Sequence, residues 1–105
     1  MTKHEEILKF ISHFNIPEVV HLFTHGQCYW FARLLQERFS DYQHLCYIVY
    51  NPIDNHFALQ HGKYLYDATG VVGSINDSSW VDWDIYKIFE PLDAARVERD
   101  CIKEI

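Results

Sequence analysis

Three residues that together can perform nucleophilic acyl transfer occur in the order Cys28, His56 and Asp67. A thiol becomes a strong nucleophile when an imidazole takes its proton. A carboxylate bonded to that imidazole fixes its tautomer and favours its charged form. Because the three residues are far apart in the chain, this chemistry requires helices and strands that bring them together.

A helix is predicted to begin at Cys28, just after the breaker Gly26. Its apolar residues recur at helical spacing and share one face, namely Cys28, Phe31, Ala32, Leu35 and Phe39. Free N–H groups and the dipole at a helix start favour a thiolate, and the Cys28 N–H could donate to a developing oxyanion. We therefore predict Cys28 as the nucleophile; the alternative is a small apolar core residue.

His56 and Asp67 lie in two predicted strands, 56–60 and 63–67, joined at His61-Gly62. If the residues flanking this turn face each other, His56 faces Asp67, with Cβ atoms about 4.5–5.5 Å apart. The alternative is a structural pair that only stabilises the hairpin.

The two sheet faces of this hairpin differ. Gln60 would face Lys63, and Ala58 and Leu65 would share the face of His56 and Asp67. The helix from Cys28 is expected to pack on this face, while the larger apolar residues point the other way, namely Phe57, Leu59, Tyr64 and Tyr66.

The remaining patterns predict a single α+β domain over residues 1–105, with helices grouped on one side of an antiparallel sheet. A helix follows the capping-box spacing at Thr2 and ends near Asn15. The other expected elements are a helical turn or two at 18–23, a strand at 44–50 buried on both faces, a turn at 51–55, a loop at 69–79, a strand at 85–89 and a final helix from Leu92 with Leu92, Ala95 and Val97 as contacts.

Gly26-Gln27-Cys28 at a helix start, then His56-Phe57-Ala58 and Tyr66-Asp67-Ala68-Thr69, resembles the papain-like cysteine hydrolase superfamily, specifically its transglutaminase-like branch. The resemblance covers roughly residues 24–70. It implies a compact papain-like core in which the helix carrying Cys28 packs on an antiparallel sheet. It also implies peptide or amide hydrolysis, deamidation or transamidation through a thioester, on a protein, peptide or amide substrate and without a cofactor.

The oxyanion side chain that papain-like peptidases place upstream of the cysteine has no match, since the residue six before Cys28 is Leu22. Candidates for oxyanion or substrate binding are Gln27, Trp30, Trp80 and Trp83. Trp80 and Trp83 follow the strands of the predicted triad and could border a substrate groove. They could equally pack in the core or form an ordinary partner-binding surface.

Composition excludes several classes of function. Nine Lys and Arg against 15 Asp and Glu give a net charge of −6, which disfavours a nucleic-acid binder. The chain has no run of about 18 apolar residues and no charged-then-apolar leader, so neither a membrane span nor a signal peptide is expected. The chain has three cysteines, an odd number without CxxC spacing, namely Cys28, Cys46 and Cys101. This argues against a disulfide framework and fits a reducing cytoplasm.

Two readings compete with the enzyme. A small cytoplasmic binding or adaptor domain could keep the fold without catalysis, with Cys46 and Cys101 as bystanders. His21, His25 and Cys28 have spacing that could suggest zinc, but a fourth ligand is not evident and Gly26 interrupts the helix the histidines would share. No metal is therefore predicted, and the oligomeric state is left open.

Overall fold

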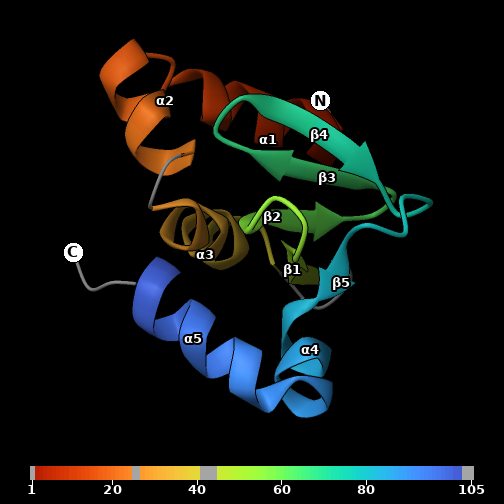
Figure 1. The fold of residues 1–105 in the computed structure, drawn as a ribbon. Coiled ribbons are helices and arrows are strands. Elements are labelled where there is room, and N and C mark those ends of the chain that lie inside the picture. Colours follow the sequence, from red (N-terminus) through yellow and green to blue (C-terminus); the bar gives the residue numbers. More distant parts are fainter. Residues whose placement is uncertain (1, 25–26, 41–44, 103–105) are drawn as a thin grey trace.

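The structure is a computed structural model that describes residues 2–24, 27–40 and 45–102. For Thr24 and Cys101 it describes the backbone only. Its centre is one antiparallel sheet with the strand order β4-β3-β2-β1-β5 (Figure 1). The strands are β1 Cys46–Asn51, β2 His56–His61, β3 Tyr64–Asp67, β4 Gly70–Ser74 and β5 Val81–Asp82.

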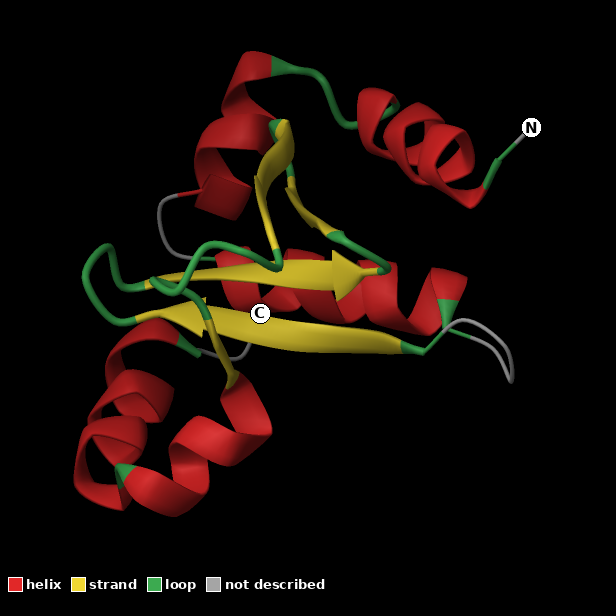
Figure 2. Cartoon of the chain, turned by 90° about the vertical axis from the view of Figure 1, so that its right-hand side faces the viewer, coloured by secondary structure: helices red, strands yellow, loops and turns green. Residues whose placement is uncertain are grey.

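The helices pack against one face of this sheet, the face of Tyr50, Phe57 and Leu59. They are α1 Lys3–Ser12, α2 Pro17–Thr24, α3 Cys28–Phe39, α4 Trp83–Phe89 and α5 Pro91–Cys101. In the view of Figure 2, α3 runs behind the central strands. The predicted α+β class with an antiparallel sheet is confirmed. Within the described ranges, no helix is both long and apolar enough to cross a membrane.

Local sequence signals explain where the first helices begin. The Thr2 hydroxyl accepts a hydrogen bond from the Glu5 N–H at 3.1 Å, as the capping-box spacing predicts. Pro17 occupies the first position of α2, where its missing N–H costs no intrahelical hydrogen bond. The α3 helix begins at Cys28, and its buried residues are the five that the helical period predicts.

The face on which α3 packs is opposite to the predicted one. Phe31 and Leu35 of α3 share a core cluster with Leu59 and Tyr66, whereas Ala58 lies in a separate cluster on the other face. The larger aromatic and aliphatic side chains offer α3 more apolar area than the small alanine does, and burial free energy follows that area. The other face is covered from β4 and the loop before β5, by Val72 and Trp80.

The hairpin turn between β2 and β3 lies one residue further along than predicted. His61 pairs with Tyr64, so Gly62 and Lys63 form the two-residue connection. Gly62 has a φ of 60°, which the first central position of a mirror-image hairpin turn requires. Glycine adopts this conformation without a Cβ clash, and so it sets the turn.

The predicted pairing of Gln60 with Lys63 is therefore wrong, because Gln60 pairs with Leu65. The direct pairing of His56 with Asp67 fails for the same reason. Each β2 residue pairs with a β3 residue two positions further along than predicted. Because this shift is an even number of residues, every side chain stays on its predicted face of the sheet. His56 and Asp67 consequently remain on one face as diagonal neighbours.

The C-terminal third differs most from the prediction. The segment 85–89 belongs to α4 rather than to a strand, since the Asp82 side chain accepts a hydrogen bond from the Ile85 N–H at 3.2 Å and caps a helix. Part of the predicted loop at 69–79 forms β4. In α5, Val97 is buried as expected, but Leu92 is 88% exposed and Ala95 is exposed, while Ala94 takes the core position.

Candidate active site

The three predicted site residues lie at one end of the sheet. Cys28 is the first residue of α3, His56 the first of β2 and Asp67 the last of β3. In Figure 1 the start of β2 and the end of β3 lie on the same side of the sheet. The His56 ring donates a hydrogen bond from Nε2 to Asp67 Oδ2 at 2.8 Å. The Cys28 thiol is close enough to the ring to raise the pKa of His56. The structure thus brings the three side chains together, with the imidazole hydrogen-bonded to the carboxylate and near the thiol.

Electrostatics at this end of the sheet favour a charged imidazole. Burial of the ring lowers the pKa of His56, but the hydrogen bond to Asp67, the nearby Cys28 thiol and the charges of both groups raise it to about 9. His56 is therefore an imidazolium at neutral pH, and its contact with Asp67 is an ion pair whose two side chains are 18% and 7% exposed. Such a pair is screened little by solvent.

Asp67 is held by a second partner that sequence reasoning missed. Its Oδ1 accepts hydrogen bonds from the Thr69 N–H at 2.7 Å and from the Thr69 hydroxyl at 2.5 Å. Burial alone would raise the pKa of Asp67, but the bonds from His56 and Thr69 outweigh it and hold the pKa below its usual value. The Asp-x-Thr spacing is typical of such local side-chain turns and could have indicated this role.

The turn before β2 fixes where His56 begins. Asn51 Oδ1 accepts hydrogen bonds from the N–H groups of Ile53 at 3.0 Å and Asp54 at 3.2 Å. Asn55 adopts a φ of 55°, a conformation that asparagine tolerates, and its side chain accepts a hydrogen bond from the Tyr50 hydroxyl. Side chains therefore fix both ends of the turn, and His56 follows directly.

The start of α3 has no side-chain cap. The first hydrogen bond of the helix runs from the Phe31 N–H to the Gln27 carbonyl at 3.2 Å, so the N–H of Cys28 precedes the intrahelical ladder. Gln27, an oxyanion candidate, does not cap the helix. Its side-chain Oε1 is buried and has no hydrogen-bond partner among the described residues.

The three tryptophan candidates lie in different surroundings. The Trp80 ring lies against the His56 ring, with centroids 6.0 Å apart, so it belongs to the site. Trp83 is 4% exposed and packs edge-on against Tyr50 and Phe57, so the prediction that it borders a substrate groove is wrong and the core alternative holds. Trp30 is half-buried on α3, with its ring against Tyr29.

Other cysteines and histidines lie away from this cluster or outside the description. Cys46 is a buried thiol that forms no disulfide and lies in the core cluster beneath α1 and α3. The side chain of Cys101 is outside the described part of the chain, as are His25 and Gly26, so the zinc pattern has no geometry to assess. No group of three or more potential metal ligands occurs among the residues that were described.

These features define an α+β domain that carries a Cys-His-Asp cluster at one end of its antiparallel sheet. The chain belongs to the family described as Phage YunG-like protein, which matches residues 7–98. That range contains Cys28, His56 and Asp67 as well as Thr69 and Trp80. No curated protein and no solved structure matches the chain.

Proposed function

We propose that this chain is a cysteine-dependent acyl-transfer enzyme with a papain-like fold of the transglutaminase-like branch. The observation that carries the proposal is the His56 ring, which is hydrogen-bonded to Asp67 at 2.8 Å and lies close enough to the Cys28 thiol for the two groups to interact electrostatically. An imidazolium beside the sulfur stabilises negative charge on it. The start of a helix at Cys28 adds backbone N–H groups that favour the same charge.

The first half of the proposed reaction forms a thioester. The Cys28 sulfur attacks the carbonyl carbon of an amide, forming a C–S bond while the carbonyl electron pair moves onto oxygen. The Cys28 N–H donates a hydrogen bond to this oxyanion. His56 then gives its proton to the leaving nitrogen as the C–N bond breaks, which releases the amine.

The second half returns the enzyme to its starting state. His56, now neutral, takes a proton from water or from an acceptor amine as that nucleophile attacks the thioester carbon. The C–S bond breaks, and its electron pair returns to the Cys28 sulfur beside the imidazolium. Water gives hydrolysis or deamidation, whereas an amine gives transamidation. Protein, peptide or amide substrates fit this chemistry, which needs no cofactor.

A cytoplasmic setting suits this proposal. A thiol nucleophile must stay reduced, and neither of the described cysteines, Cys28 and Cys46, forms a disulfide. The same two thiols are buried, which protects them from solvent oxidants.

One observation favours a second candidate, a binding domain without catalysis. Cys28 is only 5% exposed, so a substrate carbonyl has little access to its sulfur in this conformation. On this alternative, the ion pair between His56 and Asp67 stabilises the end of the hairpin and the thiol fills space.

An acylation burst separates the two candidates. Mixing the protein with p-nitrophenyl acetate should release p-nitrophenolate rapidly, in an amount approaching one per chain, with the acetyl group on Cys28 by peptide mass mapping. Cys28→Ser should abolish the burst, and the matched variant Cys46→Ala, which removes another buried thiol, should retain it. A burst that is absent, or that survives Cys28→Ser, would favour the binding domain.

A further inference from the structure

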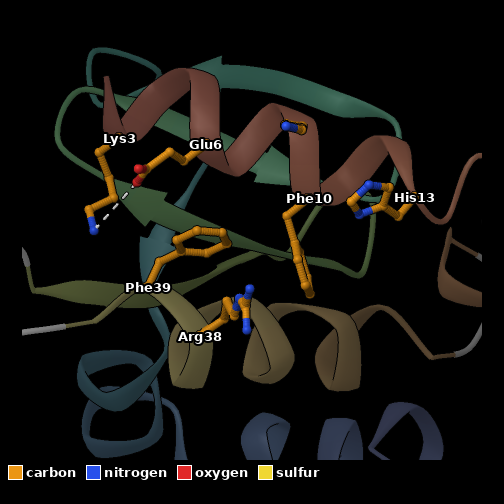
Figure 3. A pocket seen from close by; sticks show the side chains of 7 residues that line it. Lys3, Glu6, Phe10, His13, Arg38 and Phe39 are labelled. Atoms are coloured by element: carbon orange, nitrogen blue, oxygen red, sulfur yellow. Dashed lines mark ion pairs between the residues drawn. The ribbon is translucent and has the colours of Figure 1, made fainter. Parts of the chain in front are cut away.

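A cavity of about 630 Å³ lies between α1 and the C-terminal end of α3 (Figure 3). Cys28 begins α3, whereas Arg38 and Phe39 end it, and a helix of 12 residues is about 18 Å long. The cavity is therefore roughly a helix length away from the thiol. Its volume falls within the range of ordinary small-ligand sites.

Positive charge gathers at this cavity in a chain that is otherwise acidic. The described residues that line it include Lys3, Lys9 and Arg38, together with His13, and one carboxylate, Glu6. These are three of the nine Lys and Arg residues of a chain with a net charge of −6. Such a local excess is complementary to an anion.

Two of the cations have no ion-pair partner among the described residues. Lys3 pairs with Glu6 at 3.8 Å, but no carboxylate of the described segments lies within ion-pair distance of Lys9 or Arg38. By contrast, Arg33 on the same helix forms an ion pair with Glu37 at 2.8 Å. The guanidinium of Arg38 therefore has its bidentate donor edge available for a ligand.

Two phenyl rings supply an apolar surface beside these charges. Phe10 projects from α1 toward α3, and Arg38 reaches up from α3 to meet it, as Figure 3 shows, with the guanidinium 5.2 Å from the ring centroid. The Phe39 ring lies 5.5 Å from that of Phe10 in an edge-on arrangement. A flat apolar group can pack against these rings while an attached anion reaches Arg38.

We propose that this cavity binds an aromatic carboxylate, whose ring packs against Phe10 and Phe39 and whose carboxylate is held by Arg38 and Lys9. A free small molecule and the C-terminal aromatic residue of a peptide offer the same chemistry. The site is independent of the thioester reaction, since none of its lining residues belongs to the Cys28 cluster.

The test is an NMR titration of the isotope-labelled chain with 2-naphthoate and, separately, with a glycine peptide that ends in a free Phe carboxylate. Amide shifts should map to α1 and the end of α3 for at least one of them, which also identifies the source. The uncharged 2-naphthylmethanol should bind at least about tenfold more weakly than the naphthoate, the factor expected for a loss of about 1.4 kcal/mol.

Arg38→Gln should weaken binding by about tenfold, as should Lys9→Gln if Arg38→Gln fails to fold. The matched variant Arg33→Gln, on the same helix but outside the cavity, should bind as the wild type does. Equal binding of naphthoate and naphthylmethanol, shifts away from α1 and α3, no binding by either carboxylate, or equal affinity of all variants would overturn the proposal. None of these outcomes depends on whether Cys28 can be acylated.

Discussion

Asp67 Oδ2 lies 2.8 Å from His56 Nε2, although the two residues are not directly opposite in the sheet. Tyr66 pairs with Leu59, and so Asp67 falls beside Ala58, two positions from His56 on the same face. Diagonal neighbours of this kind are about 7–8 Å apart, a gap that a histidine ring spans and a shorter side chain does not. The length of the histidine side chain therefore allows the ion pair to form between diagonal positions.

Replacing Asp67 by Asn should lower the pKa of His56 from about 9 toward its ordinary value of 6.5. Asn keeps the size of the side chain but removes the negative charge that favours the imidazolium. An NMR titration of the His56 ring measures the change. An unmoved pKa would show that the carboxylate does not support the charge of the ring.

Asp67→Asn should also lower the free energy of unfolding by an amount that depends on pH. The raised pKa of His56 means that its stabilisation is fully present below pH 6.5 and is lost as pH rises through about 9. The lowered pKa of Asp67 means that its contribution is present above pH 3.8 and is lost as pH falls through the folded value. Urea unfolding should thus show the largest loss, about 2 kcal/mol, between pH 3.8 and 6.5, and little loss near pH 10.

Cys28 should react with iodoacetamide faster than Cys46 at pH 7. The two thiols are 5% and 4% exposed, so burial alone predicts equal rates and makes Cys46 an internal control. The difference is the imidazolium beside Cys28, which stabilises the sulfur as it becomes an anion. In a Cys101→Ser background, peptide mapping should show that His56→Ala slows Cys28 to the rate of Cys46. Equal rates in the wild type would exclude an activated thiol.

Thr69→Val should destabilise the protein by about 1 kcal/mol, because it removes the hydroxyl bonded to Asp67 Oδ1 and leaves the backbone bond in place. It should also move the pKa of Asp67 upward, toward 3.8. Thr69→Ser, which keeps the hydroxyl, is the control and should behave nearly as the wild type. Chemical unfolding and a carboxyl NMR titration test both parts, and identical behaviour of the two variants would remove Thr69 from the site.

Gly62→Ala should cost about 1 kcal/mol of unfolding free energy. A Cβ at this position meets no atom within 4 Å, so the cost comes only from the φ of 60°. Gly62→Asn should cost less, since asparagine tolerates this conformation, as Asn55 shows at a φ of 55°. Urea midpoints measure the order. An alanine variant as stable as the wild type would mean that the turn tolerates another conformation.

Sequence patterns predicted some elements fully and others not at all. The helix from Cys28 to Phe39 follows from five apolar residues at one period, and each of the five is buried. The segment 85–89 is rich in residues with strand propensity, and the prediction weighed that propensity above the cap at Asp82. The Asp82 cap stabilises the first turn of a helix, and the segment is helical in spite of its strand propensity.

The site was predictable in part because strand faces alternate. The turn was misplaced, yet His56 and Asp67 stayed on one face, so their contact survived the error. Which face α3 covers was not predictable from alternation, because both faces of the hairpin carry apolar residues. Cys28 meets His56 at the end of the sheet and not across its face, a relationship that depends on where α3 begins relative to β2.

The separation of the site residues along the chain sets the order in which the site assembles during folding. His56 and Asp67 are 11 residues apart in one hairpin, a local contact of the kind that forms within about 1–10 μs in isolated hairpins. Cys28 comes from a helix whose docking closes a longer loop and pays a larger entropy. A nascent or partly refolded chain would then hold the base and its carboxylate together before the thiol arrives, so the imidazole can act on the sulfur only after the core has closed.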